Sequence, residues 1–440
     1  MKTKDVSAQN AFLSIQEAMI QGKEKVSLHG WCYRERGSNK LRFITLRDSS
    51  NIIQCVVEKD NVSEAVWKDA ESIRIETALE LSGQIKKDER APTGYEVAVT
   101  HIKIVGKCEN FPIQKDTSIE FLADNRHLWL RSRRMTAIMK IRSTVFGAVH
   151  QYFRSKGFYE YQSPIFQPTQ AEGGSEVFKV PYFGDSVFLA QTWQLQAEPA
   201  IFSLEKIYTI APSFRAEKSK TSRHLTEYWH AEMEMAWSKF EDIQDHAEGV
   251  IKACIKAVLE TNQEELKILE RDPKKLEPSV HKAFPRTTYT EIVKELEKKE
   301  KIKIEWGKDL RTIEEDKLSE WYDTPVIITR YPKIVKAFYM KEDPENPKVV
   351  LGFDIIAPEH YGEIVGASQR EEDISKIEDN LRKQGENPRD YDFYLDTRRY
   401  GSVPHGGFGM GTERIIAWIC GLDSIKDAIA FPRTPERYKP

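Results

Sequence analysis

Residues 25–108 contain short runs of hydrophobic residues interrupted by polar clusters, a pattern that predicts β-strands. Five runs rich in β-branched and aromatic residues are separated by clusters of Gly, Ser, Asp and Asn, which mark turns. The runs span residues 26–33, 41–46, 52–57, 77–85 and 95–105. A short helix is expected between the third and fourth runs. Five short strands in about 80 residues predict a small β-barrel such as an OB-fold.

The rest of the chain mixes helical and strand patterns. Residues 134–156 place apolar side chains near a spacing of 3.6, which predicts a long amphipathic helix. Residues 106–118 are polar, contain one proline and show no clear period, so they predict a linker. We therefore expect an N-terminal barrel domain at 1–105, a linker at 106–118 and an α+β domain at 119–440.

Composition narrows the class of protein. The chain has 440 residues, of which 40% are hydrophobic and 31% charged, the balance of a soluble globular protein. The net charge of −3 argues against a general polyanion binder, so any nucleic acid must be bound by a local patch. The five cysteines form no CxxC pair, which favours neither a zinc site nor a disulfide framework and makes the cytoplasm the expected location. No membrane helix is expected, because no apolar run approaches about 18 residues.

Three segments of the second domain carry candidate chemistry. The first, GFYEYQSPIF at 157–166, follows the long helix and contains Pro164, which suits an edge strand. The second, at 213–237, begins and ends as apolar strand and holds several basic residues between, which suits a polyphosphate. In the third, HGGFGMGTERIIAWICGL at 405–422, glycines precede a helix, as in a phosphate-binding loop or an ordinary tight turn. Arg414 lies against the dipole of that helix, and an anionic ligand would explain it.

In this order the three segments closely resemble motifs 1, 2 and 3 of the class II aminoacyl-tRNA synthetases. FRAE with a trailing RHLTEYW, followed by GFGMGTER, carries the resemblance. RHLWLR at 126–131 and the preceding barrel resemble the subgroup that holds the aspartate, asparagine and lysine enzymes. The resemblance implies an α+β fold, in which a five-stranded OB-fold barrel precedes a catalytic domain with a six-stranded antiparallel sheet flanked by helices. It also implies a homodimer formed through residues 157–166 and the helix before them.

The resemblance assigns roles at an ATP site. Arg215 would hold the α-phosphate and stabilise the charge on the pentavalent phosphorus, so Arg215 and Arg414 are the expected catalytic residues. Tyr228 and Arg414 would sandwich the adenine ring. The remaining expected ligands of the nucleotide are Glu217, Arg223, His224 and Glu363.

Asp354 and Glu363 match the carboxylates that hold magnesium in the family, and two hard oxygen ligands together with phosphates suit Mg²⁺. The implied reaction has two steps. The carboxylate of an amino acid attacks the α-phosphorus of ATP, and the terminal ribose of tRNA then attacks the aminoacyl-adenylate. Positioning and charge stabilisation suffice, without a covalent nucleophile.

The expected amino acid is asparagine, and the expected nucleic-acid partner is tRNA(Asn). Members that bind aspartate resemble one another at QSPQxxK, where the lysine neutralises the substrate, and here QTWQLQAE places Ala197 at that position. Glu198 would accept a hydrogen bond from the amide NH₂ and Arg370 would donate one to the amide oxygen. KAFY at 336–339 also resembles the asparagine-specific members, whereas Trp193 and Gln196 depart from them.

Two further sets of ligands follow from the resemblance. In the segment 169–178, Glu172 would meet the α-ammonium group of the amino acid, Gln194 its α-carboxylate, and Gly173–Gly174 would permit closure. In the barrel, Phe43 would stack on the central anticodon base and Gln54 would hydrogen-bond to it. Five basic residues and one acid between positions 34 and 47 support such a surface. Strand alternation alone does not decide whether Phe43 lies on that surface or in the core.

Three alternatives remain. The chain could be an aspartyl or non-discriminating enzyme, a synthetase-derived paralogue that makes free asparagine, or an inactive tRNA-binding protein. The barrel argues against the paralogue, and the intact set of ATP-site residues argues against an inactive protein.

Overall fold

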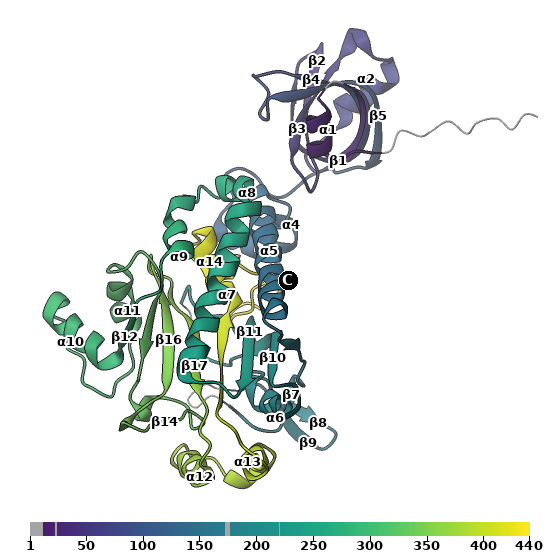
Figure 1. Cartoon of the computed structure of the whole chain (residues 1–440). Coiled ribbons are helices and arrows are strands. Elements are labelled where there is room, and N and C mark those ends of the chain that lie inside the picture. Colours follow the sequence, from purple (N-terminus) through teal and green to yellow (C-terminus); the bar gives the residue numbers. More distant parts are fainter. Residues whose placement is uncertain (1–11, 23, 172–176, 220) are drawn as a thin grey trace, which may run out of the picture. The chain divides into compact units, whose positions relative to one another are not determined.

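The computed structural model describes residues 12–22, 24–171, 177–219 and 221–440. The chain divides into two compact units, Met1–Leu122 and Ala123–Pro440, each of which is considered by itself (Figure 1). No helix within the described residues is long and apolar enough to cross a membrane.

The first unit is a closed five-stranded barrel, which confirms the predicted OB-fold. Its strands are β1 (Lys25–Gly37), β2 (Leu41–Arg47), β3 (Ile52–Glu58), β4 (Ala78–Lys87) and β5 (Tyr95–Gly106), in the order β1-β2-β3-β5-β4. Helix α1 (Ile15–Gln21) precedes β1. The expected helix between the third and fourth strands is α2 (Glu64–Ser72). Ile44 and Leu46 of β2 lie in the barrel core, so Phe43 and Thr45 point the other way.

The second unit is built on an eight-stranded sheet in the order β12-β13-β16-β17-β18-β11-β10-β6. The strands are β6 (Tyr159–Glu160), β10 (Lys206–Phe214), β11 (Glu227–Ala236), β12 (Arg286–Thr288), β13 (Val326–Thr329), β16 (Gly352–Ala357), β17 (Gly362–Gln369) and β18 (His405–Gly411). The six from β13 to β10 pair antiparallel, as predicted, and β12 and β6 extend that sheet with one parallel pair at each edge.

Two smaller sheets complete the strands of this unit. One contains β7 (Phe166–Gln167), β8 (Lys179–Tyr182) and β9 (Asp185–Leu189), and the other contains β14 (Glu342–Asp343) and β15 (Asn346–Val350). The helices are α3 (Ile119–Asp124), which spans the division between the units, α4 (Arg126–Trp129), α5 (Arg133–Ser155), α6 (Gln194–Leu204), α7 (Phe240–Thr261), α8 (Gln263–Ile268), α9 (Glu277–His281), α10 (Tyr289–Glu300), α11 (Thr312–Ser319), α12 (Ile374–Lys383), α13 (Asp392–Arg399) and α14 (Thr412–Cys420).

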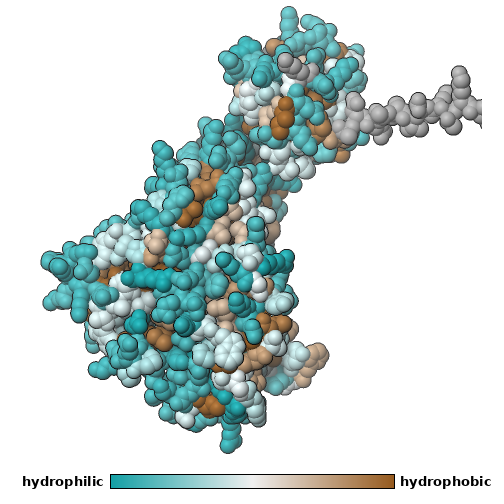
Figure 2. All heavy atoms as spheres, viewed as in Figure 1, coloured by the Kyte–Doolittle hydropathy of each residue, from teal (hydrophilic) through white to brown (hydrophobic). Residues whose placement is uncertain are grey.

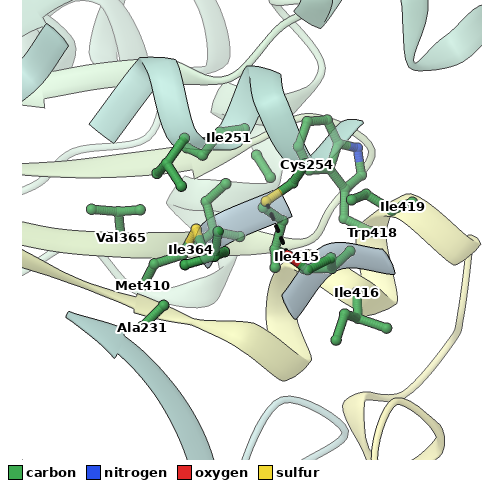
Figure 3. Close-up of a cluster of buried hydrophobic side chains, with 14 of the residues drawn as sticks. Ala231, Ile251, Cys254, Ile364, Val365, Met410, Ile415, Ile416, Trp418 and Ile419 are labelled. Atoms are coloured by element: carbon green, nitrogen blue, oxygen red, sulfur yellow. Dashed lines mark hydrogen bonds between the residues drawn. The ribbon is translucent and has the colours of Figure 1, made fainter. Parts of the chain in front are cut away.

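Helices α5, α7 and α14 cover the sheet and form the main core with it (Figure 1). Helix α5 is the predicted amphipathic helix, and it begins at Arg133 because the side chain of Ser132 caps the N–H of Met135. Figure 3 shows how Ile251 of α7 and Ile415 of α14 meet Val365 of β17 and Met410 of β18. The helices therefore shield one face of the sheet from water and leave the other to the site.

The glycine-rich segment HGGFGMG is a central strand, β18, rather than a loop. It pairs with β17 on one side and β11 on the other. A Cβ atom at Gly407 would lie 2.0 Å from the carbonyl oxygen of Met233, and one at Gly406 would lie 2.2 Å from Cδ1 of Ile243. Two of these glycines thus permit close packing of strand against strand and helix.

Candidate active site

A pocket of about 600 Å³ lies over the centre of the large sheet. Strand β11 supplies part of its wall, because the period of two in a strand points Tyr228, His230 and Glu232 to the same side. Gly366 of β17 and Gly409 of β18 also line the pocket, and both lack a side chain that would fill it. The basic residues in the wall are Arg215, Arg223, His224, His230, Lys336, Arg370 and Arg414.

The two arginines that were predicted to be catalytic lie in this one pocket. Arg215 follows β10, and its guanidinium carbon is 5.6 Å from the ring centroid of Tyr228. Arg414 projects from the first turn of α14 and donates from Nη1 to the carbonyl oxygen of Glu363 at 2.5 Å. The structure thus brings together residues that are separated by about two hundred positions, as a polyphosphate site requires.

His224 and Glu217 are neighbours, since Nε2 of His224 is 3.9 Å from a carboxylate oxygen of Glu217. Burial, with Arg414 as the next cause, lowers the pKa of His224. His224 lines the pocket, whereas Glu217 is not among the described residues of its wall.

Arg223 is held by acidic groups and a carbonyl rather than pointing at open space. Its Nη2 donates to Asp316 of α11 at 2.6 Å and to the carbonyl oxygen of His360. Its Nη1 lies 3.9 Å from Glu315. Burial, together with Glu363, raises the pKa of Glu315 to about 7. These contacts fasten the segment after β10 to α11 at the rim of the pocket.

Asp354 and Glu363, the predicted magnesium ligands, flank the same glycine. A Cβ atom at Gly366 would lie 3.2 Å from one oxygen of Glu363 and 3.8 Å from one oxygen of Asp354. Lys336 Nζ is 2.6 Å from Asp354. Burial, opposed by Lys336 and reinforced by Glu363, raises the pKa of Asp354 to about 7.

No group of three or more His, Cys, Asp or Glu side chains arranged to hold a metal occurs within the described residues. The adjacent carboxylates of Asp354 and Glu363 nevertheless suit a hard cation whose remaining ligands come from phosphate oxygens and water.

Gln194 and Arg370, which were predicted to bind the amino acid, both line the other end of the pocket, beside Thr192 and Glu232. Arg370 is buried, donates from Nη1 to Ser368 Oγ at 2.7 Å and from Nε to Glu234 at 3.3 Å. Glu232 accepts a hydrogen bond from the N–H of Trp193 at 3.1 Å. This end of the pocket therefore offers both an acceptor and a donor.

Glu198, the predicted acceptor for the amide, is not in the described pocket wall. Its side chain is fully buried under α6, and both carboxylate oxygens already have partners. Oε1 accepts from Gln194 at 2.8 Å and from Tyr394 at 3.0 Å, while Oε2 lies 2.7 Å from Arg398 Nη1. Glu172, the predicted ligand of the α-ammonium group, lies outside the described residues, as do Gly173 and Gly174.

In the barrel unit, Phe43 and Gln54 share the outer face. Phe43 is partly exposed, and the guanidinium carbon of Arg36 on β1 lies 5.0 Å from its ring centroid. Gln54 pairs across the strands with Thr45, which points to the same side as Phe43. Gln54 Nε2 donates to Glu96 at 3.0 Å. Strand alternation left open whether Phe43 lies on the surface or in the core, and the structure places it on the surface of the barrel.

Several residues of the pocket wall were missed by sequence reasoning, among them His230, Glu232, Asp309 and Lys336, as was Glu315 beside Arg223 at the rim. For the strand residues a signal existed, since EYWHAEMEMA has polar side chains at every second position of an otherwise apolar run. For Asp309 and Glu315 no local signal existed, because they come from a charged segment whose approach to the pocket is a property of the tertiary fold.

Residues 118–435 match the family model of class II tRNA synthetases (D, K and N), and residues 26–105 match that of the OB-fold nucleic acid binding domain. The asparagine–tRNA ligase of Thermoplasma acidophilum is 47% identical over 97% of this chain and 100% of that protein.

Solved structures are similar over nearly the whole chain as well. The asparaginyl-tRNA synthetase from Pyrococcus horikoshii, complexed with asparaginyl-adenylate, superposes with a TM-score of 0.94 at 42% identity, covering 98% of this chain and 100% of that one. The Entamoeba histolytica asparaginyl-tRNA synthetase in complex with asparaginyl-adenylate has a TM-score of 0.85 at 31% identity, covering 95% and 96%.

Proposed function

The chain belongs to the class II tRNA synthetases (D, K and N), and we propose that it joins asparagine to tRNA(Asn) by way of an asparaginyl-adenylate made from ATP. The observation that carries the proposal is the single pocket that has arginines for a polyphosphate at one end and an acceptor–donor pair at the other. The structure of a relative that is 42% identical is complexed with asparaginyl-adenylate, a ligand with an amino-acid part and a nucleotide part.

In the first step the asparagine carboxylate attacks the α-phosphorus of ATP and pyrophosphate leaves. Arg215 stabilises the charge that develops on the phosphorus, and Arg414 and Tyr228 hold the base. His224 faces the leaving pyrophosphate. In the second step the terminal ribose of tRNA attacks the adenylate carbonyl and AMP leaves. The protein contributes position and fixed charge in both steps.

Magnesium is the cofactor that this site would take. Asp354 and Glu363 are the residues that would hold it, and their adjacent carboxylates, of which that of Asp354 is buried, are the support for the assignment. When bound, the ion would neutralise phosphate charge and so favour the attack. Lys336, paired with Asp354, keeps part of this negative charge compensated.

Asparagine is read by Glu232 and Arg370. A carboxamide needs one acceptor for its NH₂ and one donor for its oxygen, and these two side chains supply them in the pocket wall. This assignment moves the acceptor from Glu198 to Glu232, because Glu198 lies beneath the wall. Ala197, at the position where the lysine of aspartate enzymes is expected, is fully buried and carries no charge.

Aspartate is rejected by the balance of charge. Near the amino-acid end, Glu198 is paired with Arg398 and Glu234 with Arg370, while Glu232 lies 2.8 Å from Nδ1 of His230. Burial raises the pKa of Glu234 to about 7 against the effect of Arg370, and the neighbouring Glu198 acts in the same direction as burial. A further carboxylate would be buried without a cation, whereas the neutral amide adds no charge.

The activity is tested by ATP–pyrophosphate exchange and tRNA charging with each amino acid. We expect kcat/KM for asparagine to exceed that for aspartate by about 10⁴-fold, as in sites built around one hydrogen-bonding group. Equal activation of both would indicate a non-discriminating enzyme. Release of free asparagine without tRNA charging would indicate the paralogue.

Replacing Arg215 with Ala removes a donor to the transferring phosphate. We expect the rate of adenylate formation to fall by about 10²–10³, while tRNA binding changes little, because the expected anticodon contacts lie on the barrel. Arg382→Ala is the matched control, since Arg382 is an exposed arginine paired with Glu378 on α12. An exchange rate in Arg215→Ala within a few-fold of the control would contradict the ATP site.

Replacing Phe43 with Ala should weaken tRNA binding by about 1–3 kcal/mol, the contribution of one stacked base, with pyrophosphate exchange unaffected. Phe43→Tyr, which keeps the ring, is the control. KM for tRNA is the measurement. If Phe43→Ala and Phe43→Tyr charged tRNA equally well at sub-saturating concentration, the anticodon surface would lie elsewhere on the barrel.

The chain also forms a homodimer through residues 157–166 and α5. Large apolar side chains are exposed there: Tyr159 is 60% exposed, Ile165 44% and Phe166 50%. Figure 2 shows apolar side chains at the surface near the β7-β9-β8 sheet. Strand β6 is the last strand of the large sheet, so its outer edge can take a partner. Sedimentation at micromolar concentration should give a dimer, and a monomer would contradict this surface.

The cytoplasm is the compartment that fits this function, because the substrates are made and used there. All five cysteines are free thiols, which is compatible with a reducing compartment.

A further inference from the structure

Beneath the amino-acid end of the pocket lies a buried polar layer around Glu198, and Gln194 joins this layer to the pocket wall. Three elements meet there: α6 supplies Glu198 and Gln194, α13 supplies Tyr394 and Arg398, and β18 begins with His405. Every one of these side chains is buried. Gln194 and Glu198 are four residues apart on one helix face, as are Tyr394 and Arg398.

Glu198 has no oxygen to spare in this layer. In addition to the bonds from Gln194, Tyr394 and Arg398, its Oε2 lies 3.1 Å from Nε2 of His405. Although burial opposes it, Arg398 and His405 hold the pKa of Glu198 below its ordinary value. Glu198 is therefore a buried carboxylate whose charge is stabilised chiefly by the fully buried Arg398, with His405 beside it.

Arg398 is fixed from several sides. Its Nε donates to the carbonyl oxygen of Glu371 at 3.0 Å, its Nη1 to Thr397 at 2.7 Å, and its Nη2 to the hydroxyl of Tyr394 at 2.8 Å. Its guanidinium carbon also lies 4.1 Å from the ring centroid of Tyr394. These contacts fix the position of Arg398, which in turn holds Glu198 in place.

The second cation near Glu198 is Arg370, whose Nε is 3.9 Å from Oε1. Arg370 instead makes its hydrogen bonds to Glu234 and Ser368. The competition matters because Arg370 lines the pocket and Gln194, tied to the other side of Glu198, lines it as well. Without Arg398, Glu198 would keep its contacts with Gln194, Tyr394 and His405 but would lose its paired guanidinium. Its attraction for Arg370 would then be stronger, in a site with little water to screen it.

We propose that Arg398 is a positioning residue for amino-acid selection: by pairing with Glu198 it keeps Arg370 directed to Glu234 and the pocket, and keeps Gln194 in the pocket wall. This role rests on the proposed function, because it acts on the residues that bind asparagine. Arg398 lies 28 positions after Arg370 in the chain and outside all three motif segments. Its position in the sequence alone therefore gives no sign of the role.

The test compares Arg398→Met, which removes the charge and keeps much of the bulk, with the double variant Arg398→Met/Glu198→Gln, which removes both charges. In the single variant we expect KM for asparagine to rise about tenfold, the effect of misaligning one charge-assisted hydrogen bond, with KM for ATP unchanged. The double variant should recover most of this loss, since no charge is then left without a partner. A merely structural role would make the double variant no better than the single one.

Glu198→Gln alone gives the opposite imbalance. It leaves Arg398 without its carboxylate, so a positive charge is in excess beneath the pocket. We expect kcat/KM for aspartate to rise about tenfold relative to that for asparagine. Unchanged discrimination in this variant would overturn the proposal.

Arg399→Met is the matched control, because Arg399 is the next residue on α13 but pairs with Asp392 and Asp396 at the surface. It should leave both KM values and the melting temperature as in the wild type. If Arg398→Met does not fold, Tyr394→Phe removes one donor to Glu198 without changing any charge and should raise KM for asparagine alone by about threefold.

These outcomes test the proposed function and the role of Arg398 separately. A wild type that does not activate asparagine would refute the proposed function. A wild type that does, together with an unchanged KM for asparagine in Arg398→Met or Tyr394→Phe, would refute only the role of Arg398. An equal rise of both KM values would assign Arg398 to general stability and also overturn the role.

Discussion

The second unit depends on keeping ionised side chains paired in places that water does not reach. A buried charge without a partner would destabilise the fold by several kcal/mol, so each one restricts which elements can lie next to it. Glu413, at the start of α14, illustrates the constraint. It accepts from Arg142 of α5 at 2.7 Å and from the N–H of Trp229 on β11 at 2.9 Å. One carboxylate thus ties α14 to β11, which carries part of the second motif, and to α5, the helix that precedes the first motif.

The same constraint makes the two ends of the pocket different. At the amino-acid end the charged side chains pair with one another, Arg370 with Glu234 and Arg398 with Glu198, and Arg370 also lies near Glu198. A neutral substrate side chain disturbs these pairs least. At the other end, Asp354 and Glu315 have raised pKa values because they are buried close to Glu363. A cation bound at that end would offset this negative charge.

Sequence reasoning reached the parts of this arrangement that are local. Arg215, Tyr228 and Arg414 belong to contiguous motifs, and the structure places all of them in one pocket. The barrel follows from alternation, and the long helix begins within one residue of the expected position because Ser132 caps it. The features that the sequence did not predict are those that depend on tertiary contacts. The glycines of β18 look like a loop until strands on both sides are known, and Phe43 is assigned to the surface only once Ile44 and Leu46 are seen inside the barrel.

Glu198 shows most clearly why a motif identifies a residue more readily than its role. Its position beside the missing lysine suggested a direct contact with the amide, because neighbours in sequence were taken as neighbours in the site. On a helix, however, adjacent residues point in directions about 100° apart, so Ala197 and Glu198 cannot both face the ligand. The residue that shares a helix face with Glu198 is Gln194, one turn earlier, and it is Gln194 that reaches the pocket. Glu198 therefore acts on the amino acid at one remove, through the side chains that it holds, and the charge that decides its behaviour comes from Arg398, two hundred residues further along the chain.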